Sequence, residues 1–319
     1  MPKLLITRPL PDAVVAAVSP EFDVEVRAET LPLTADEMAG ALTEYDAILP
    51  TLGDPLSAAV IASAHPSRCK ILANFGVGYN HIDVAAAKAA GMAVSNTPGA
   101  VTDATADIAL TLMLMTCRRA GEGERAVRAD QWPGWHPTQF LGMHMSGKTV
   151  GVVGMGRIGK AIARRAAFGF GMEVVFYNRS RVEDAGVPAK QLETLAEVCA
   201  AADVVVMAVP ATPTTHHMMD AEALSHMQPH GVLVNIARGD VVDEAALIAA
   251  LEAGRIAGAG LDVYEFEPKV PDALKALENV TLLPHLGTAA LEVRVDMGLM
   301  AVGNLNAWVK GDALPNAVD

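Results

Sequence analysis

The sequence predicts an α/β protein with two doubly wound parallel sheets. From the first residues onward, short runs rich in β-branched residues alternate with Ala-rich segments typical of helices. The alternation occurs in two series, which are separated by a long helical segment and a loop rich in Trp, Pro and Gly. Because 319 residues can form two hydrophobic cores, we expect two domains.

The first series contains five candidate strands, enough for one small open sheet. They are expected at residues 3–7, 22–27, 47–51, 70–74 and 92–95. Helical segments lie between them, for example at 35–42 and 84–90. After Pro98 and Gly99, the sequence predicts one long helix over about 104–129.

The second series contains six candidate strands that are almost continuously apolar, as strands buried on both faces are. They are expected at 149–153, 173–177, 204–209, 232–236, 256–261 and 280–283. A last helix, about 289–309, has no strand after it, so we expect it to cross back to the first domain. The predicted division is 1–98 plus 289–319 for one domain and 99–288 for the domain inserted into it.

Charge and hydropathy exclude several classes of protein. The net charge of -13, without any basic run interleaved with aromatics, argues against a nucleic-acid partner. The apolar stretch from Ile108 to Cys117 is much shorter than the roughly 20 residues that a membrane span needs. The first residues lack the pattern of a secretory leader, so we expect a cytoplasmic protein that does not bind membranes.

No metal site is predicted from the cysteines and histidines. Cys69, Cys117 and Cys199 are far apart and lie in apolar or Ala-rich sequence, which indicates small core residues. The adjacent histidines His216 and His217 have no partner at helical spacing. Neighbours in an extended chain seldom reach the same metal ion.

A glycine motif follows the first strand of the second series. Gly154, Gly156 and Gly159 form G-x-G-x-x-G between an apolar strand and a helical stretch that begins at Arg157. The first glycine permits a tight turn, the second lets the backbone approach a pyrophosphate, and the third allows close packing of helix on strand. The N-terminus of the helix then presents free N–H groups to the phosphates. The alternative is a glycine turn without a ligand.

The residues after the next strand bear on the choice of nicotinamide cofactor. An acidic side chain there would hydrogen-bond the 2′-hydroxyl of NAD. This chain has Asn178, Arg179, Ser180 and Arg181 instead. With no carboxylate to repel a 2′-phosphate and with guanidinium groups to bind one, NADPH is favoured over NADH. Alternatively, the two arginines only begin a solvated loop.

With these motifs the chain resembles the D-2-hydroxyacid dehydrogenases, and within them the glyoxylate, hydroxypyruvate or glycerate reductases. The likeness covers nearly the whole length. It rests on the glycine motif and on the stretches 74–83, 96–99, 103–107, 235–239, 260–264 with Glu267-Pro268, and 284–287. The resemblance implies a Rossmann dinucleotide-binding domain inserted into a flavodoxin-like substrate domain, with the substrate in the cleft between them.

The resemblance implies that Arg238, Glu267 and His285 are the catalytic residues, and their chemistry is suited to that role. Reduction of a 2-oxo acid by hydride places negative charge on the carbonyl oxygen, so the reaction needs a proton donor and a fixed cation. His285 would be the general acid. An ionised Glu267 would orient its ring and favour the protonated form, and Arg238 would bind the substrate carboxylate.

The resemblance also implies weaker assignments. The cofactor would contact Gly154, Gly156, Arg157, Ile158, Gly159, Asn178, Arg179, Ser180, Arg181, Thr105, Val209, Pro210, Ala237, Asp262 and Gly287. In that set, Thr105 would lie by the nicotinamide and Asp262 would hold its carboxamide. Val77, Gly78, Leu52 and Arg294 would contact the substrate, although Arg294 could equally form a salt bridge.

The expected activity is NAD(P)H-dependent reduction of a small 2-oxo acid to the D-2-hydroxy acid, with glyoxylate and hydroxypyruvate favoured. The segment from Leu49 to Asp54 has no cation to meet a substrate phosphate. Two alternatives remain open: a dehydrogenase of another anion such as phosphite, and a non-catalytic protein that senses NAD(P)H. A homodimer is expected, in which Trp132 and Trp135 would be core or interface residues.

Overall fold

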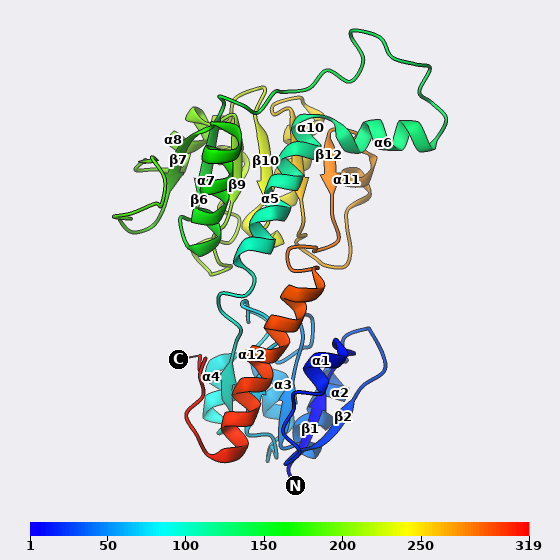
Figure 1. Cartoon of the computed structure of the whole chain (residues 1–319), viewed down its shortest axis with the longest axis vertical. Helices are drawn as coiled ribbons and strands as arrows, with labels where there is room; N and C mark the ends of the chain where they lie inside the picture. The colour runs from blue at the N-terminus through cyan, green and yellow to red at the C-terminus, as the bar shows by residue number, and fades with distance from the viewer. Residues whose placement is uncertain (319) are drawn as a thin grey trace. The chain divides into compact units, whose positions relative to one another are not determined.

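The computed structural model describes residues 1–318, which form two compact units (Figure 1). Unit 1 consists of Met1–Val101 and the segment that begins at Ala289, and unit 2 consists of Thr102–Thr288. The sequence placed the first boundary three residues earlier, after residue 98. No helix within residues 1–318 is both long and apolar enough to cross a membrane.

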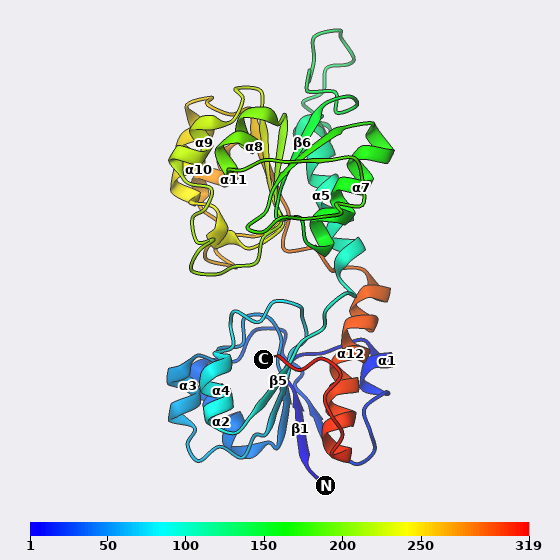
Figure 2. The ribbon, with the colours of Figure 1, turned by 90° about the vertical axis from the view of Figure 1, so that its left-hand side faces the viewer.

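Unit 1 contains a five-stranded parallel sheet with helices on both faces (Figure 2). The strand order is β2-β1-β3-β4-β5, the doubly wound order of flavodoxin-like folds. The strands are β1 (Lys3–Ile6), β2 (Asp23–Val26), β3 (Ala47–Leu49), β4 (Ile71–Ala73) and β5 (Ala93–Ser95). The helices are α1 (Asp12–Val15), α2 (Ala35–Glu44), α3 (Ala58–Ser63), α4 (Val84–Ala89) and α12 (Leu291–Lys310).

The last helix returns to unit 1, as the sequence predicted. Helix α12 packs against β4 and against α1, where Gly298 lets the two helices approach closely. A side chain at Gly298 would lie 2.4 Å from a methyl carbon of Val14. The opposite face of the sheet is covered by α2, α3 and α4 around a core that includes Met38, Ile48 and Leu72.

Unit 2 contains a seven-stranded sheet in the order β12-β11-β10-β9-β6-β7-β8, all parallel. Its strands are β6 (Thr149–Val153), β7 (Glu173–Tyr177), β8 (Lys190–Gln191), β9 (Val204–Met207), β10 (Val232–Asn235), β11 (Gly258–Leu261) and β12 (Val280–Leu282). The six expected strands are present. Strand β8 was not predicted, because this two-residue edge strand contains no apolar run.

Two cores lie on the two faces of this sheet because successive side chains point to opposite sides. Val150, Val204 and Val234 face one core, together with α5 (Thr102–Cys117) and α7 (Arg157–Phe170). The other face packs against the remaining helices (Figure 2). These are α8 (Leu195–Ala201), α9 (Ala221–His226), α10 (Glu244–Glu252) and α11 (Asp272–Ala276), and the short helix η1 (Gly239–Val241) precedes α10.

The helix expected over 104–129 is two helices, so that prediction was wrong. Arg119 adopts a left-handed backbone (φ 52°) between α5 and α6 (Ala120–Arg128). Its guanidinium binds both carboxylate oxygens of Glu122 at 2.7 and 2.8 Å. Helix α5 packs against both the sheet and α7, whereas α6 buries none of its residues. A helical pattern in the sequence could not reveal this difference in packing.

All three cysteines are free and buried, as expected for core residues. Burial raises the pKa of Cys69 to about 12, and it does the same for Cys117 and Cys199. Such thiols remain protonated near neutral pH and are poor nucleophiles.

Candidate active site

The glycine motif forms the turn between β6 and α7. Gly154 has φ +100°, and a side chain there would lie 2.7 Å from the carbonyl oxygen of Ala208. A side chain at Gly159 would lie only 2.1 Å from the carbonyl oxygen of Gly154. In contrast, nothing approaches within 4 Å of a side chain built at Gly156, the N-cap of α7. The turn therefore leaves open space at the end of a 14-residue helix, where the free N–H groups suit a phosphate.

Asn178, which follows β7, holds this turn in place. Its side-chain oxygen accepts a hydrogen bond from the amide of Met155 at 3.2 Å, and its NH₂ group donates to the carbonyl of Ser180 at 2.9 Å. The side chains of Arg179 and Arg181 are exposed and make no ion pair or hydrogen bond within residues 1–318. Val209, in the loop that also contains Pro210, lies beside Gly154.

Asp262, at the end of β11, organises the segment that contains His285. Its two carboxylate oxygens accept hydrogen bonds from the amides of Leu286 (2.6 Å) and Gly287 (2.8 Å), and its carbonyl accepts one from the amide of His285 (2.9 Å). Burial raises the pKa of Asp262, while these amides and the charge of His285 act to lower it. The hydroxyl of Thr105 on α5 donates to the carbonyl of Gly287 at 3.3 Å.

His285 and Glu267 form a hydrogen-bonded pair. The distance between His285 Nδ1 and Glu267 Oε2 is 2.8 Å, and the two side chains are 29% and 30% exposed. His285 has a left-handed backbone (φ 55°), a conformation that bulky residues rarely adopt. Since an ionised carboxylate only accepts hydrogen bonds, Nδ1 carries the hydrogen and Nε2 is left for another partner.

Glu267 is held in its ionised form. Burial acts to raise its pKa, but the hydrogen bond and charge of His285, the amide of Tyr264 and the charge of Arg238 outweigh it, so the pKa lies below its usual value. The amide of Tyr264 donates to Glu267 Oε1 at 3.1 Å. Both oxygens of Glu267 therefore have a donor, one on the histidine and one on its own loop.

Arg238 follows β10, in the segment that also contains Ala237. The side chain of Asn235 donates to the carbonyl of Arg238 at 2.9 Å and accepts from the amide of Ala237 at 3.0 Å, which stabilises the turn. Burial lowers the pKa of Arg238, while the charges of Glu267 and Asp240 oppose this change. The guanidinium remains protonated because arginine does not deprotonate in proteins.

The strand ends of one sheet thus bring together the predicted residues of unit 2. The loops after β10, β11 and β12 contain Arg238, Glu267 and His285, and the turn after β6 contains the glycine motif. In open parallel sheets, ligands bind at the carboxyl ends of the strands.

Val77, Gly78 and Leu52 lie in unit 1, on loops after β4 and β3. Asn96 donates to the carbonyl of Val77 at 2.9 Å, and Asn74 donates to the carbonyl of Gly78 at 3.0 Å. The amides of Val77 and Gly78 donate no hydrogen bond within residues 1–318. These two N–H groups are thus available to an anion.

Arg294, the fourth predicted substrate contact, also lies in unit 1, on the first turn of α12. Its side chain is partly buried, and this burial lowers its pKa.

Comparison with known proteins places this chain in a family. Residues 110–287 match the model of the D-isomer specific 2-hydroxyacid dehydrogenase NAD binding domain. The chain is 42% identical to a glyoxylate reductase of Pyrococcus furiosus, over 100% of this chain and 95% of the relative. It belongs to the D-isomer-specific 2-hydroxyacid dehydrogenases.

Two further relatives extend the comparison. The chain is 37% identical to a glycerate dehydrogenase of Hyphomicrobium methylovorum, over 97% of this chain and 96% of the relative. The structure of an NADPH-dependent glyoxylate/hydroxypyruvate reductase of Sinorhizobium meliloti, in complex with NADP and malonate, is similar with a TM-score of 0.85 and 36% identity. That match covers 99% of this chain and 96% of the other.

Sequence reasoning missed the residues of this dehydrogenase that support the loop of Glu267. Glu244, at the start of α10, is 6% exposed and accepts a hydrogen bond from the amide of Glu265 at 2.9 Å. Gly239 packs directly against the same loop. A glycine directly after the predicted catalytic arginine was the only available signal, and it did not indicate which loop it would contact.

Substitution of Gly239 by alanine is expected to disrupt the site. The new Cβ would lie 1.8 Å from the carbonyl carbon of Tyr264 and 2.2 Å from the amide nitrogen of Glu265, so the loop of Glu267 must move. Overpacking of this kind costs about 1–3 kcal/mol. We expect a lower unfolding temperature together with a loss of turnover, measured by calorimetry and steady-state kinetics. Gly303→Ala on α12 is the matched control, because nothing lies within 4 Å there and an alanine should stabilise the helix.

The pair of Glu267 and His285 also predicts a dependence of stability on pH. Since the pKa of Glu267 is lowered in the folded dehydrogenase, its stabilising contribution is present above the unfolded value of about 4.3 and is lost as the pH falls through the folded value. A pair this exposed contributes at most about 1 kcal/mol. Glu267→Gln should therefore lower the melting temperature by roughly 2–4 °C or less at pH 7, and by progressively less below about pH 4. A difference that grows towards acid pH would contradict the assignment.

Proposed function

We propose that this dehydrogenase reduces glyoxylate and hydroxypyruvate to the corresponding D-2-hydroxy acids, with NADPH as the preferred reductant. The observation that carries the proposal is the pair of His285 Nδ1 and Glu267 Oε2 at 2.8 Å, close to the partly buried cation Arg238. The names of the relatives from Pyrococcus furiosus and Sinorhizobium meliloti support the choice of substrate.

Each of the three residues has a role in reduction. Glu267 holds the hydrogen of His285 Nδ1, so the proton on Nε2 is the one that His285 donates to the carbonyl oxygen. Arg238 binds the carboxylate of the 2-oxo acid and stabilises the negative charge that develops on the neighbouring oxygen. When bound, the nicotinamide cofactor supplies the hydride. Val77, Gly78, Leu52 and Arg294 are the predicted further substrate contacts.

The residues of unit 2 fit a dinucleotide. The space at Gly156 and the N-terminus of α7 would receive the pyrophosphate, with Arg157 and Ile158 in the first turn. Thr105, Ala237, Asp262 and Gly287 would lie by the nicotinamide, where Asp262 retains acceptor capacity for the carboxamide while it holds two amides.

Preference for NADPH is supported by the exposed, uncommitted side chains of Arg179 and Arg181. Asn178 binds Met155 and Ser180, and as a neutral amide it contributes no negative charge that would repel a 2′-phosphate. A guanidinium group binds phosphate through paired N–H donors.

Arg179→Ala is expected to weaken NADPH much more than NADH. Loss of one charge-assisted phosphate contact costs about 1.5–3 kcal/mol, or roughly a 10- to 150-fold increase in the dissociation constant of NADPH. Fluorescence titration of both reduced cofactors measures the difference. Equal losses for the two cofactors would contradict contact with a 2′-phosphate, and Arg164→Ala on α7 serves as a surface control.

An absorbance assay at 340 nm tests the function. Glyoxylate, hydroxypyruvate, pyruvate and phenylpyruvate are each offered with NADPH and with NADH, and phosphite is offered with the two oxidised cofactors. Fastest oxidation with glyoxylate or hydroxypyruvate supports the proposal. Cofactor reduction with phosphite alone would favour the first alternative, and turnover below about 0.01 per second on every substrate would favour an NAD(P)H-sensing protein.

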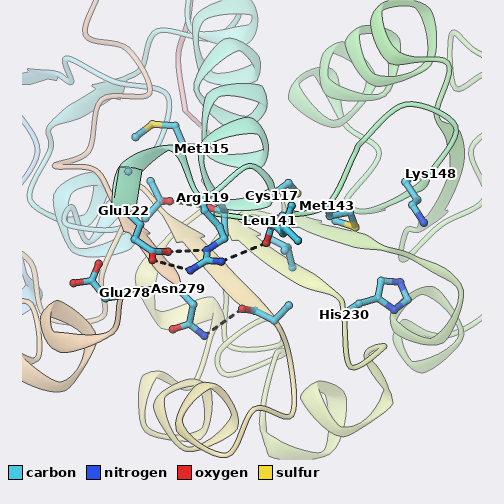
Figure 3. A pocket seen from close by; sticks show the side chains of 16 residues that line it. Met115, Cys117, Arg119, Glu122, Leu141, Met143, Lys148, His230, Glu278 and Asn279 are labelled. Atoms are coloured by element: carbon cyan, nitrogen blue, oxygen red, sulfur yellow. Dashed lines mark hydrogen bonds and ion pairs between the residues drawn. The ribbon is translucent and has the colours of Figure 1, made fainter. Parts of the chain in front are cut away.

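We also propose that the protein is a homodimer assembled through unit 2. Helix α6 and the loop that follows it project from the unit in Figure 1, and the loop is also seen to project in Figure 2. This arm exposes Trp132 (51%) and Trp135 (81%), so neither is a core residue. At its base lies a cavity of about 690 Å³, whose lining in Figure 3 includes Met115, Leu141 and Met143. A second copy of the chain, related by a twofold axis, would bury the exposed tryptophans and cover the cavity at the same time.

Sedimentation at several concentrations tests this assembly. Replacement of both tryptophans by serine should convert the dimer into a monomer, and a wild-type protein that is monomeric at about 10 µM would overturn the proposal. The expected cytoplasmic location stays a prediction.

A further inference from the structure

Two histidines and one glutamate gather on the loops at the carboxyl edge of the unit 2 sheet, apart from the catalytic pair. His216 and His217 lie in the loop after β9, and Glu265 lies in the loop after β11. One ligand atom of each residue lies within 4.8 Å of the other two. His217 Nε2 is 3.0 Å from Glu265 Oε1, and the two imidazole rings stack with their centres 4.0 Å apart.

We propose that these three side chains bind a divalent transition metal ion such as Zn²⁺ or Co²⁺. Two imidazoles and a carboxylate are ligands that such ions accept, and the fourth position would be left for water or a small anion. Metal binding by these three residues would not require the proposed hydride transfer.

The backbone explains how adjacent histidines can reach one ion. The sequence argument against a metal assumed an extended chain, in which neighbouring side chains point apart. His217 instead has φ 49°, in the left-handed region, and its amide donates to the carbonyl of Asp240 at 2.8 Å. This turn brings the two rings over one another. Because His216 is exposed, its ring can rotate to shorten the distances to about those of a tetrahedral site.

The local charge favours a cation. The side chain of Glu265 is only 16% exposed, and within residues 1–318 its carboxylate pairs with His217 alone. Two further carboxylates lie in the same region: Glu244 accepts a hydrogen bond from the amide of Glu265, and Glu267 lies two residues further along the same loop. A bound cation would compensate the negative charge of Glu265, which is otherwise costly to remove from water.

Such an ion would connect two loops that are separated along the main chain by α9, β10, η1, α10 and β11. Glu265 lies two residues before Glu267, and the same loop is already held by Gly239 and by Glu244. The metal would add a link from this loop to the one that begins after β9. Its effect should therefore be to reduce local opening of both loops.

Isothermal titration of the untagged protein with Zn²⁺ tests the site, after any bound metal has been removed with a chelator. We expect saturable binding of one ion per chain. His216→Ala, His217→Ala and Glu265→Gln should each weaken it by at least about 10-fold, since even residues that only support metal ligands have effects of that size. His226→Ala, which removes an exposed histidine at the end of α9, should bind as the wild type does.

Two further measurements make the result independent of a folding defect. Co²⁺ should give the visible absorption of a low-coordinate site in the wild type and not in Glu265→Gln, a variant of the same shape. Zn²⁺ should slow hydrogen exchange in residues 210–218 and 263–269 of the wild type alone. Absence of saturable binding, one ion shared by two chains, or unchanged affinity in all three ligand variants would overturn the proposal.

Discussion

His285→Ala is expected to lower turnover by about 10²- to 10⁴-fold while the affinity for NADPH changes little. The substitution removes the group that donates the proton, and the carbonyl oxygen must then take it from water. The fold should survive, because the backbone amides of residues 285–287 donate hydrogen bonds to the carbonyl and the carboxylate of Asp262, and these bonds do not involve the imidazole. Steady-state kinetics at 340 nm and cofactor titration measure the two quantities.

His226→Ala is the matched control, since it removes an exposed histidine from α9 in the same unit. If His285→Ala retained the wild-type turnover, His285 would have no part in proton transfer. A parallel loss of NADPH affinity would instead indicate a defect in the cofactor site.

Arg238→Lys should reduce kcat/KM by about 10²- to 10³-fold although the positive charge is kept. A lysine lacks the planar fork that binds a carboxylate through two N–H groups. Moreover, burial lowers the pKa of Arg238 in the native site, and a lysine at the same place would lose its proton far more readily.

Kinetics with glyoxylate, together with NADPH titration, separate this effect from cofactor binding. Arg164→Lys on the exposed face of α7 is the control for a loss of arginine as such. Wild-type kcat/KM in Arg238→Lys would show that a point charge suffices and would exclude bidentate binding.

The sequence was most informative where the local backbone accepts only one type of residue. Gly154 and Gly159 were predicted from their spacing between an apolar strand and a helical stretch, and the structure shows that a Cβ at either position would overlap backbone atoms. The order of strands and helices likewise followed from apolar runs and their period, and the predicted return of the last helix to the first domain was correct.

Patterns failed where packing against distant residues decides the outcome. The pattern over 104–129 is helical throughout, but whether a helix continues depends on what covers it, and α6 has no core to join. Asn178 stays a predicted cofactor contact, but its place after a strand gave no sign that its side chain would also hold the amide of Met155 in the glycine turn.

By itself, the sequence determined the fold class, the glycine turn and the types of residue that hydride transfer to a 2-oxo acid requires. Only the tertiary structure decided which loops meet: Glu265 reaches His217, Glu244 holds the loop of Glu267, and Gly239 packs beneath it. The physical reason is the distance along the chain between the residues that interact. Local turns follow from the sterics of neighbouring residues, whereas a contact between loops depends on the register of three parallel strands, to which every residue of the core contributes.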